Sequence, residues 1–141
     1  MKIIIIEDDL KIREELSKLL KKNGYETILL NEFENIPLQI ENIDANLILL
    51  DINLPFENGY EICRKIKNIS NIPIIFVTSR DSTQDEIMSI QVGGIDFISK
   101  PYDTIILLEK IKRAINLTDP KNFKEMTKKG YTLDLHLSLL K

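Results

Sequence analysis

Charged side chains follow three apolar runs of the sequence, at the points where buried strands would end. In chain order, they are Glu7, Asp8 and Asp9 after the run 3–6, Asp51 after the run 47–50, and Lys100 after the run 95–98. In an open parallel sheet, the carboxyl ends of the strands share one edge, and ligands bind there. Carboxylates that meet a lysine at that edge predict a metal site suited to handling a phosphoryl group.

Strand-like runs alternate with helix-like stretches along most of the chain. The predicted strands span 2–6, 25–30, 47–50, 73–77 and 95–98, and the predicted helices span 10–22, 33–42, 57–67, 82–91 and 102–116. A run that is apolar on both faces indicates a fully buried strand. Five strand–helix pairs in this order predict an α/β fold, with one parallel sheet and helices on both faces.

Short polar motifs predict where several helices begin and end. Asn23 and Gly24 end the first helix, because glycine is free to adopt the left-handed conformation there. Ser82 and Asp85 form a capping pair at the start of the fourth helix. Pro37 interrupts the second helix early, so that helix is expected to be weak.

The charged residues also have a purely structural interpretation. Asp8 or Asp9 could cap the first helix, and a cap at this place is about as common as a metal ligand. A lone Lys100 would be a solvated charge, and a lone Thr78 an ordinary strand-end residue. No predicted helix starts directly after Asp51, so capping explains that residue less well. Convergence at one sheet edge favours the metal site, with Asp9 as the better candidate for the cap.

Length and composition are those of an ordinary globular domain. The chain has 141 residues, of which 43% are hydrophobic and 29% charged, and its formal net charge is −3. That charge gives no sign of a nucleic-acid or membrane-surface binder. The run 3–6 is too short for a signal-peptide core or a membrane span, and Cys63, the only cysteine, is expected to pack in a helix. We therefore expect a cytoplasmic protein without membrane contact.

Residues 117–141 differ from the part before them. Positions 117–129 are polar and include the breaker Asp119–Pro120, and positions 131–135 then alternate like a half-buried strand. One interpretation is an ordered or frayed tail. The other is a linker and the first strand of a second domain that this chain lacks. His136 has no metal-ligand companions in the tail and is expected to be incidental.

The strand-end motifs resemble those of the receiver domain of two-component response regulators. The resemblance covers residues 1–116 and rests on Ile5–Asp9, Leu49–Pro55, Asn58–Gly59, Val77–Ser79 and Lys100–Pro101. It implies a doubly wound (βα)5 parallel sheet of the flavodoxin and CheY type, with strand order 2-1-3-4-5.

The resemblance also implies a site. Asp51 would be the phosphoacceptor, since an aspartate can attack phosphorus and form an acyl phosphate. Mg²⁺ would be held by Glu7, Asp8, Asp51 and the backbone carbonyl of Asn53, with Asp8 and Asp51 as direct ligands. Lys100, joined to Pro101 by a cis bond, would pair with Asp51 and later with the phosphoryl group.

The implied switch lies behind the site. Thr78 would move toward the phosphoryl group, and Phe97 would turn inward behind it. The face made by the fourth helix, fifth strand and fifth helix would then change.

The phosphodonor would be a histidine on a separate sensor kinase. Residues 131–135 resemble the opening strand of the winged-helix domain in OmpR/PhoB-type transcription regulators. Such proteins bind DNA only through that second domain, and they form homodimers through the face just described.

The residues of that face depart from the group's pattern. Asp96 and Lys110 could form a charge pair across it. Three other positions carry unexpected side chains for the group: Glu86, Ile95 and Ile106. Together with the apolar run 105–108, they predict a more hydrophobic dimer contact, similar to that of the cell-envelope-stress and antimicrobial-peptide regulators of Gram-positive bacteria.

The expected switch is not an enzyme, but it assists its own phosphoryl transfer and dephosphorylation. Two other functions compete with this interpretation. A degenerate receiver would serve only as an interaction module, and its mark would be loss of Asp8, Asp51 or Lys100, all of which are present. A Mg²⁺-dependent phosphohydrolase of the haloacid-dehalogenase type would carry Asp-x-Asp-x-Thr or Asp-x-Asp-x-Val after its first strand. The segment 7–11 does not match that pattern.

Overall fold

Strands and helices alternate strictly along the chain in the computed structural model, which describes residues 1–80 and 82–118. The strands are β1 (Lys2–Ile6), β2 (Glu26–Leu29), β3 (Leu47–Leu50), β4 (Ile74–Thr78) and β5 (Asp96–Ser99). The helices are α1 (Leu10–Lys22), α2 (Ile36–Glu41), α3 (Gly59–Ile69), α4 (Thr83–Gln91) and α5 (Thr104–Thr118). No helix of this described part is long and apolar enough to cross a membrane.

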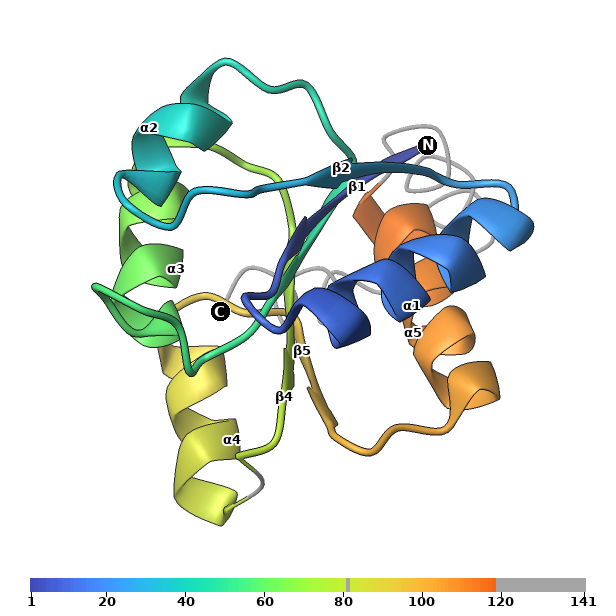
Figure 1. Ribbon diagram of the computed structural model, residues 1–141. Helices are drawn as coiled ribbons and strands as arrows, with labels where there is room; N and C mark the ends of the chain where they lie inside the picture. The colour runs from blue at the N-terminus through green and yellow to red at the C-terminus, as the bar shows by residue number, and fades with distance from the viewer. Residues whose placement is uncertain (81, 119–141) are drawn as a thin grey trace, which may run out of the picture.

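All neighbouring strands pair in parallel, in the order β2-β1-β3-β4-β5. Helices α1 and α5 cover one face of the sheet, and α2, α3 and α4 cover the other (Figure 1). The predicted fold class and strand order are therefore confirmed.

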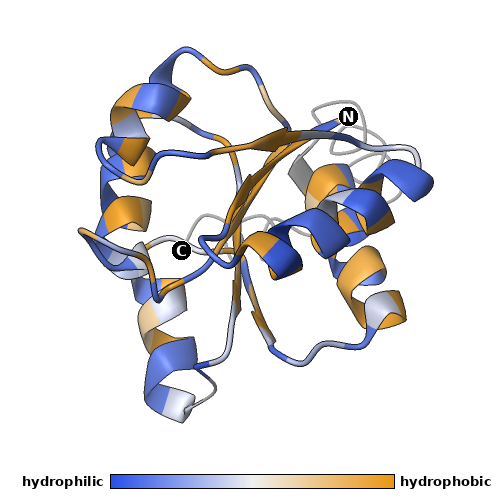
Figure 2. Ribbon diagram, in the orientation of Figure 1, coloured by the Kyte–Doolittle hydropathy of each residue, from blue (hydrophilic) through white to orange (hydrophobic). Residues whose placement is uncertain are grey.

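Two hydrophobic cores lie on opposite faces of the sheet. Ile4 and Ile48 belong to the core under α2, α3 and α4, whereas Ile3 and Leu49 belong to the core under α1 and α5. Successive side chains of a strand point to opposite faces, so only a continuous apolar run can fill both cores. Figure 2 shows these apolar strands between the two helical layers.

Helix α2 differs from its prediction. It is shorter than the expected range 33–42, and Pro37 lies in its first turn instead of interrupting it. Proline is tolerated there because the first amide groups of a helix have no partner within the helix.

Some of the acidic residues near the sheet edge cap helices and so have a structural role. The Asp9 carboxylate accepts the backbone N–H of Ile12 at 3.2 Å and so caps α1, as predicted. Ser82 caps α4 in the same way by accepting the N–H of Asp85, which is also as predicted. Helix α5 begins at Thr104, later than expected, because the Asp103 carboxylate accepts the first backbone N–H groups of that helix.

Candidate metal and phosphoryl site

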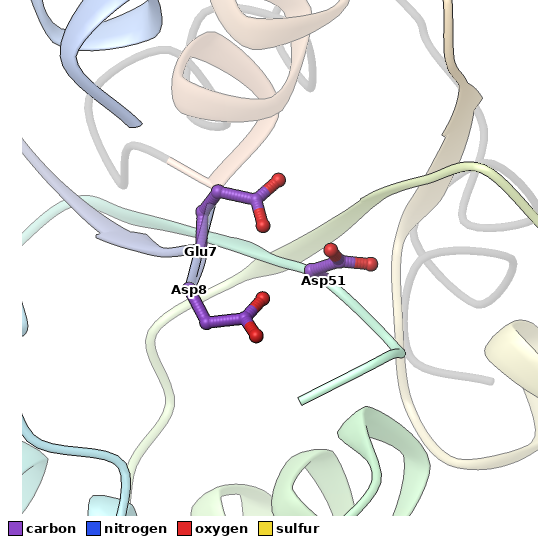
Figure 3. Close-up of side chains that lie close together, drawn as sticks. All are labelled: Glu7, Asp8 and Asp51. Carbon is purple, nitrogen blue, oxygen red and sulfur yellow. The ribbon is translucent and has the colours of Figure 1, made fainter. Parts of the chain in front are cut away.

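The carboxylates of Glu7, Asp8 and Asp51 meet at the C-terminal edge of the sheet, where β1 lies beside β3. One oxygen from each lies within 4.8 Å of the others, and all three side chains extend to the same side of the sheet edge (Figure 3). Glu7 and Asp51 are buried, whereas Asp8 is exposed. Mg²⁺ favours a few carboxylates together with waters and phosphate oxygens, so this partly open donor set suits it.

Lys100 directly follows β5, and its side chain reaches these carboxylates although β4 lies between β5 and β3. Its ammonium forms an ion pair with Glu7 and lies 3.2 Å from Oδ2 of Asp51. Only 14% of the side chain is exposed. The peptide bond between Lys100 and Pro101 is cis. One buried cation therefore contacts two of the three clustered acids.

Burial and charge together set the protonation of this cluster. Burial raises the pKa of Glu7 to about 7, against the hydrogen bond from Lys100, which lowers it. Burial lowers the pKa of Lys100, but the hydrogen bond to Glu7 and the charge of Asp51 outweigh it, so the pKa is raised overall. Lys100 is therefore charged at neutral pH and offsets part of the repulsion between the acids.

The other residues predicted for the site lie at or behind the same edge. The backbone N–H of Asn53 donates to Oδ1 of Asp51 at 3.3 Å. Thr78 ends β4 and is fully buried. Phe97 is buried in the core on the α2, α3 and α4 face. Asn53 therefore contacts Asp51 directly, Thr78 ends the neighbouring strand β4, and Phe97 belongs to the hydrophobic core.

Helix α3 starts against the backbone of Asp51, which sequence reasoning did not predict. The N–H of Gly59 donates to the carbonyl of Ile52 at 2.8 Å. A Cβ atom at Gly59 would lie 2.3 Å from the carbonyl oxygen of Asp51. Glycine is therefore required for this close approach. The only signal in the sequence was a glycine directly after the capping residue Asn58.

Arg80 also lies at the rim of the site, and the sequence analysis assigned it no role. Its Nε–H donates to the side-chain oxygen of Asn53 at 2.9 Å. Its place two residues after Thr78 was the available signal, but a surface arginine is ordinary by itself.

The residues predicted for the dimer face lie on β5 and α5. The Lys110 ammonium is 3.3 Å from Oδ1 of Asp96, and the Arg113 guanidinium is 2.7 Å from Oδ2. These ion pairs form within one chain. Ile106 is 54% exposed.

Comparison with known proteins agrees with the fold. The model of the response regulator receiver domain family matches residues 3–112. YvcP of Bacillus subtilis, an uncharacterized transcriptional regulatory protein, is 39% identical over 117 residues, which are 83% of this chain and 49% of YvcP. The response regulator GraR of Staphylococcus aureus is 33% identical over 112 residues, which are 79% of this chain and 50% of GraR.

A solved structure is similar as well. The N-terminal domain of the nisin resistance regulator NsrR, a lantibiotic response regulator, superposes with a TM-score of 0.73 at 34% identity, over 81% of this chain and 97% of that domain. The chain belongs to the family of response regulator receiver domains. It spans about half the length of the curated relatives it matches. Receiver domains are generally not enzymes, in agreement with the expectation from the sequence.

Proposed function

We propose that Asp51 accepts a phosphoryl group from a phosphohistidine of a sensor kinase in a Mg²⁺-dependent reaction. The observation that carries this proposal is the buried Asp51 carboxylate, 3.2 Å from Lys100 and clustered with two further acids. A bond forms between an Asp51 oxygen and phosphorus while the N–P bond of the phosphohistidine breaks. The imidazole nitrogen keeps the bonding electron pair.

Four groups would hold the metal: the carboxylates of Glu7, Asp8 and Asp51, and the backbone carbonyl of Asn53. When bound, Mg²⁺ supplies charge neutralisation and polarises the phosphoryl oxygens. The Lys100 ammonium then pairs with the phosphoryl group, and the Thr78 hydroxyl donates to one of its oxygens. Such transfer needs mostly positioning and charge stabilisation, which these side chains supply.

Intact-mass measurement of the chain incubated with Mg²⁺ and acetyl phosphate tests this proposal. We expect a single phosphate adduct that is lost in Asp51→Asn and lost when EDTA removes the metal. Asp9→Asn is the matched control, because Asp9 follows β1 directly after Glu7 and Asp8 but caps α1, and it should keep the adduct. Absence of an adduct would favour an interaction module, and steady turnover of phosphate esters would favour a hydrolase.

The output proposed for this switch is transcription control by a second domain. The support is that YvcP is named as a transcriptional regulatory protein and that the chain covers about half of such relatives. An OmpR/PhoB-type winged-helix domain would follow the receiver of residues 1–116 and would make the DNA contact, in a cytoplasmic protein. Its proposed first strand, 131–135, lies outside the described residues.

The proposed dimer forms through α4, β5 and α5 after Thr78 and Phe97 respond to phosphorylation. Asp96 and Lys110 already pair within one chain, so their contribution across a dimer contact is reduced. Ile105 and Ile106, 71% and 54% exposed, leave α5 with an apolar outer face. This supports a hydrophobic contact of the kind expected for envelope-stress and antimicrobial-peptide regulators.

A further inference from the structure

Polar contacts, more than buried apolar side chains, hold the first turn of α4. Within this helix only Ser89 is buried, whereas Ile87 and Ile90 are about half exposed. The Tyr60 hydroxyl of α3 donates to Oδ1 of Asp85 at 2.7 Å. Because little apolar surface is buried here, loss of a polar contact is expected to loosen the turn locally.

Asp85 is the acceptor on which these polar contacts converge. The Ser82 hydroxyl donates to Oδ2, while Oδ1 accepts from Tyr60 and lies 3.7 Å from Nη1 of Arg80. Hydrogen bonds, first that from Ser82 and then that from Tyr60, lower the pKa of Asp85. Asp85 is therefore a carboxylate at neutral pH, at the helix end where negative charge is favoured.

Arg80 joins this cluster to the rim of the carboxylate site. Its Nε–H donates to the Asn53 side chain at 2.9 Å, and its backbone N–H donates to Oγ1 of Thr78 at 3.4 Å. The backbone N–H of Asn53 in turn contacts the Asp51 carboxylate. The ion pair with Asp85 is long, and 47% of the Arg80 side chain is exposed, so the guanidinium has room to turn.

We propose that Arg80 is a positioning residue that couples the site to α4, because a phosphoryl group on Asp51 and the carboxylate of Asp85 compete for its guanidinium. This inference rests on the proposed phosphorylation of Asp51. The acyl phosphate carries up to about two negative charges and three acceptor oxygens, in place of the single charge of the Asp51 carboxylate. Guanidinium binds such groups in bidentate fashion, more strongly than a long single ion pair. As Arg80 turns toward Asp51, Asp85 loses its ion-pair partner and the first turn of α4 loosens.

Hydrogen exchange of the backbone amides of residues 82–88 tests the coupling in the 141-residue chain. Exchange is followed by mass spectrometry with and without acetyl phosphate and Mg²⁺, at a concentration where the chain sediments as a monomer. Intact mass gives the phosphorylated fraction of each sample. In the unchanged chain, phosphorylation should speed exchange several-fold. In Arg80→Ala, exchange should already be fast, and phosphorylation should add nothing.

Tyr60→Phe is the matched control. It removes one donor to Asp85 but leaves Arg80 in place. Exchange should therefore be faster in both states, and the phosphorylation-dependent step should persist. A merely structural role for Arg80 predicts the same pattern in Arg80→Ala as in Tyr60→Phe.

The outcomes separate this inference from the proposed function. Two results would overturn the coupling and leave the phosphoacceptor role intact. One is unchanged amide exchange in the phosphorylated chain, and the other is an Arg80→Ala chain in which phosphorylation still speeds exchange. An Arg80→Ala chain that no longer accepts phosphate places Arg80 in the transfer itself and also contradicts the coupling. An unchanged chain that takes no phosphate overturns the proposed function and, with it, the competition for Arg80.

Discussion

Lys100 offsets part of the charge of two buried carboxylates that would otherwise repel each other. Its ammonium pairs with Glu7 and Asp51, which lie at the ends of two adjacent strands. Removing one partner from a buried charge cluster is costly because the remaining charges lose their compensation. At the scale of single residues, Lys100 is therefore expected to contribute to the free energy of unfolding as well as to the site.

Lys100→Met should lower the free energy of unfolding by about 3 kcal/mol without metal. Saturating Mg²⁺ should reduce this loss, because a divalent cation would neutralise the same carboxylates. Urea unfolding with and without Mg²⁺ measures both quantities. Lys65→Met is the control, since its ion pair with Glu57 is exposed and should be worth under about 1 kcal/mol. Equal losses in the two variants would contradict the prediction.

Cys63 is packed in the core as predicted, and burial raises the pKa of its thiol to about 12. A raised pKa means less thiolate at mildly alkaline pH, so the folded chain should react with a thiol reagent only through opening. Because the folded pKa lies above the ordinary value of 9.0, this thiol should also cost stability as the pH rises above 9.0. With dithiobis(nitrobenzoate) as the thiol reagent, the absorbance of released thionitrobenzoate gives the rate at which Cys63 reacts. A folded chain that reacts as fast as its urea-unfolded form would refute the prediction.

At the scale of elements, the start of α3 is placed by its close approach to the segment that directly follows β3. Gly59 lies against the backbone of Asp51 and Ile52, where a side chain has no room. Gly24 differs, because its φ is +90° but nothing lies within 4 Å of an added Cβ. Glycine is therefore needed at position 59 for lack of space, and at position 24 for its backbone conformation.

Gly59→Ala should lower the free energy of unfolding by about 3 kcal/mol, at the upper end of overpacking costs. It should also slow the phosphorylation of Asp51, because the clash falls on the backbone of that residue. Gly24→Ala should cost about 1 kcal/mol from backbone strain alone and leave phosphorylation unchanged. Urea unfolding and intact mass on both variants provide the comparison. Unchanged phosphorylation in Gly59→Ala would show that α3 does not position Asp51.

At the scale of the whole molecule, the outer side of α5 is the surface proposed for a second copy of the chain. Hydrophobic residues recur along this helix (Figure 2). Two of them, Ile105 and Ile106, have exposed side chains. Burying exposed apolar surface of this kind against a partner is energetically favourable.

Ile106→Lys should prevent dimerisation of the phosphorylated chain, or of the chain activated with a beryllofluoride mimic. A charge placed in an apolar contact is costly to desolvate. Sedimentation at high protein concentration measures the association. Ile69→Lys is the control, because Ile69 ends α3 and is 45% exposed, so this variant should still dimerise. An unchanged chain that stays monomeric after activation would refute the proposed dimer.

Local pattern was sufficient to predict the elements and the edge where the acids gather. Short continuous apolar runs such as 3–6 and 47–50 predict buried strands, and the residue after each run then lies at the end of its strand. Caps are equally local, so Asp9 and Ser82 were assigned correctly from neighbouring residues. The bounds of α2 were wrong because propensity alone does not tell a proline in the first turn from one that interrupts a helix.

Contacts between distant positions were decided only by the tertiary structure. The ion pair from Lys100 to Glu7, the approach of Gly59 to Asp51, and the bond from Arg80 to Asn53 each join segments that meet only after the sheet is ordered. Side-chain type and strand position showed that carboxylates would gather at one edge, because strand direction is set by the alternation of elements. Which cation contacts which carboxylate depends on the three-dimensional packing of neighbouring strands and helices, which no local pattern contains.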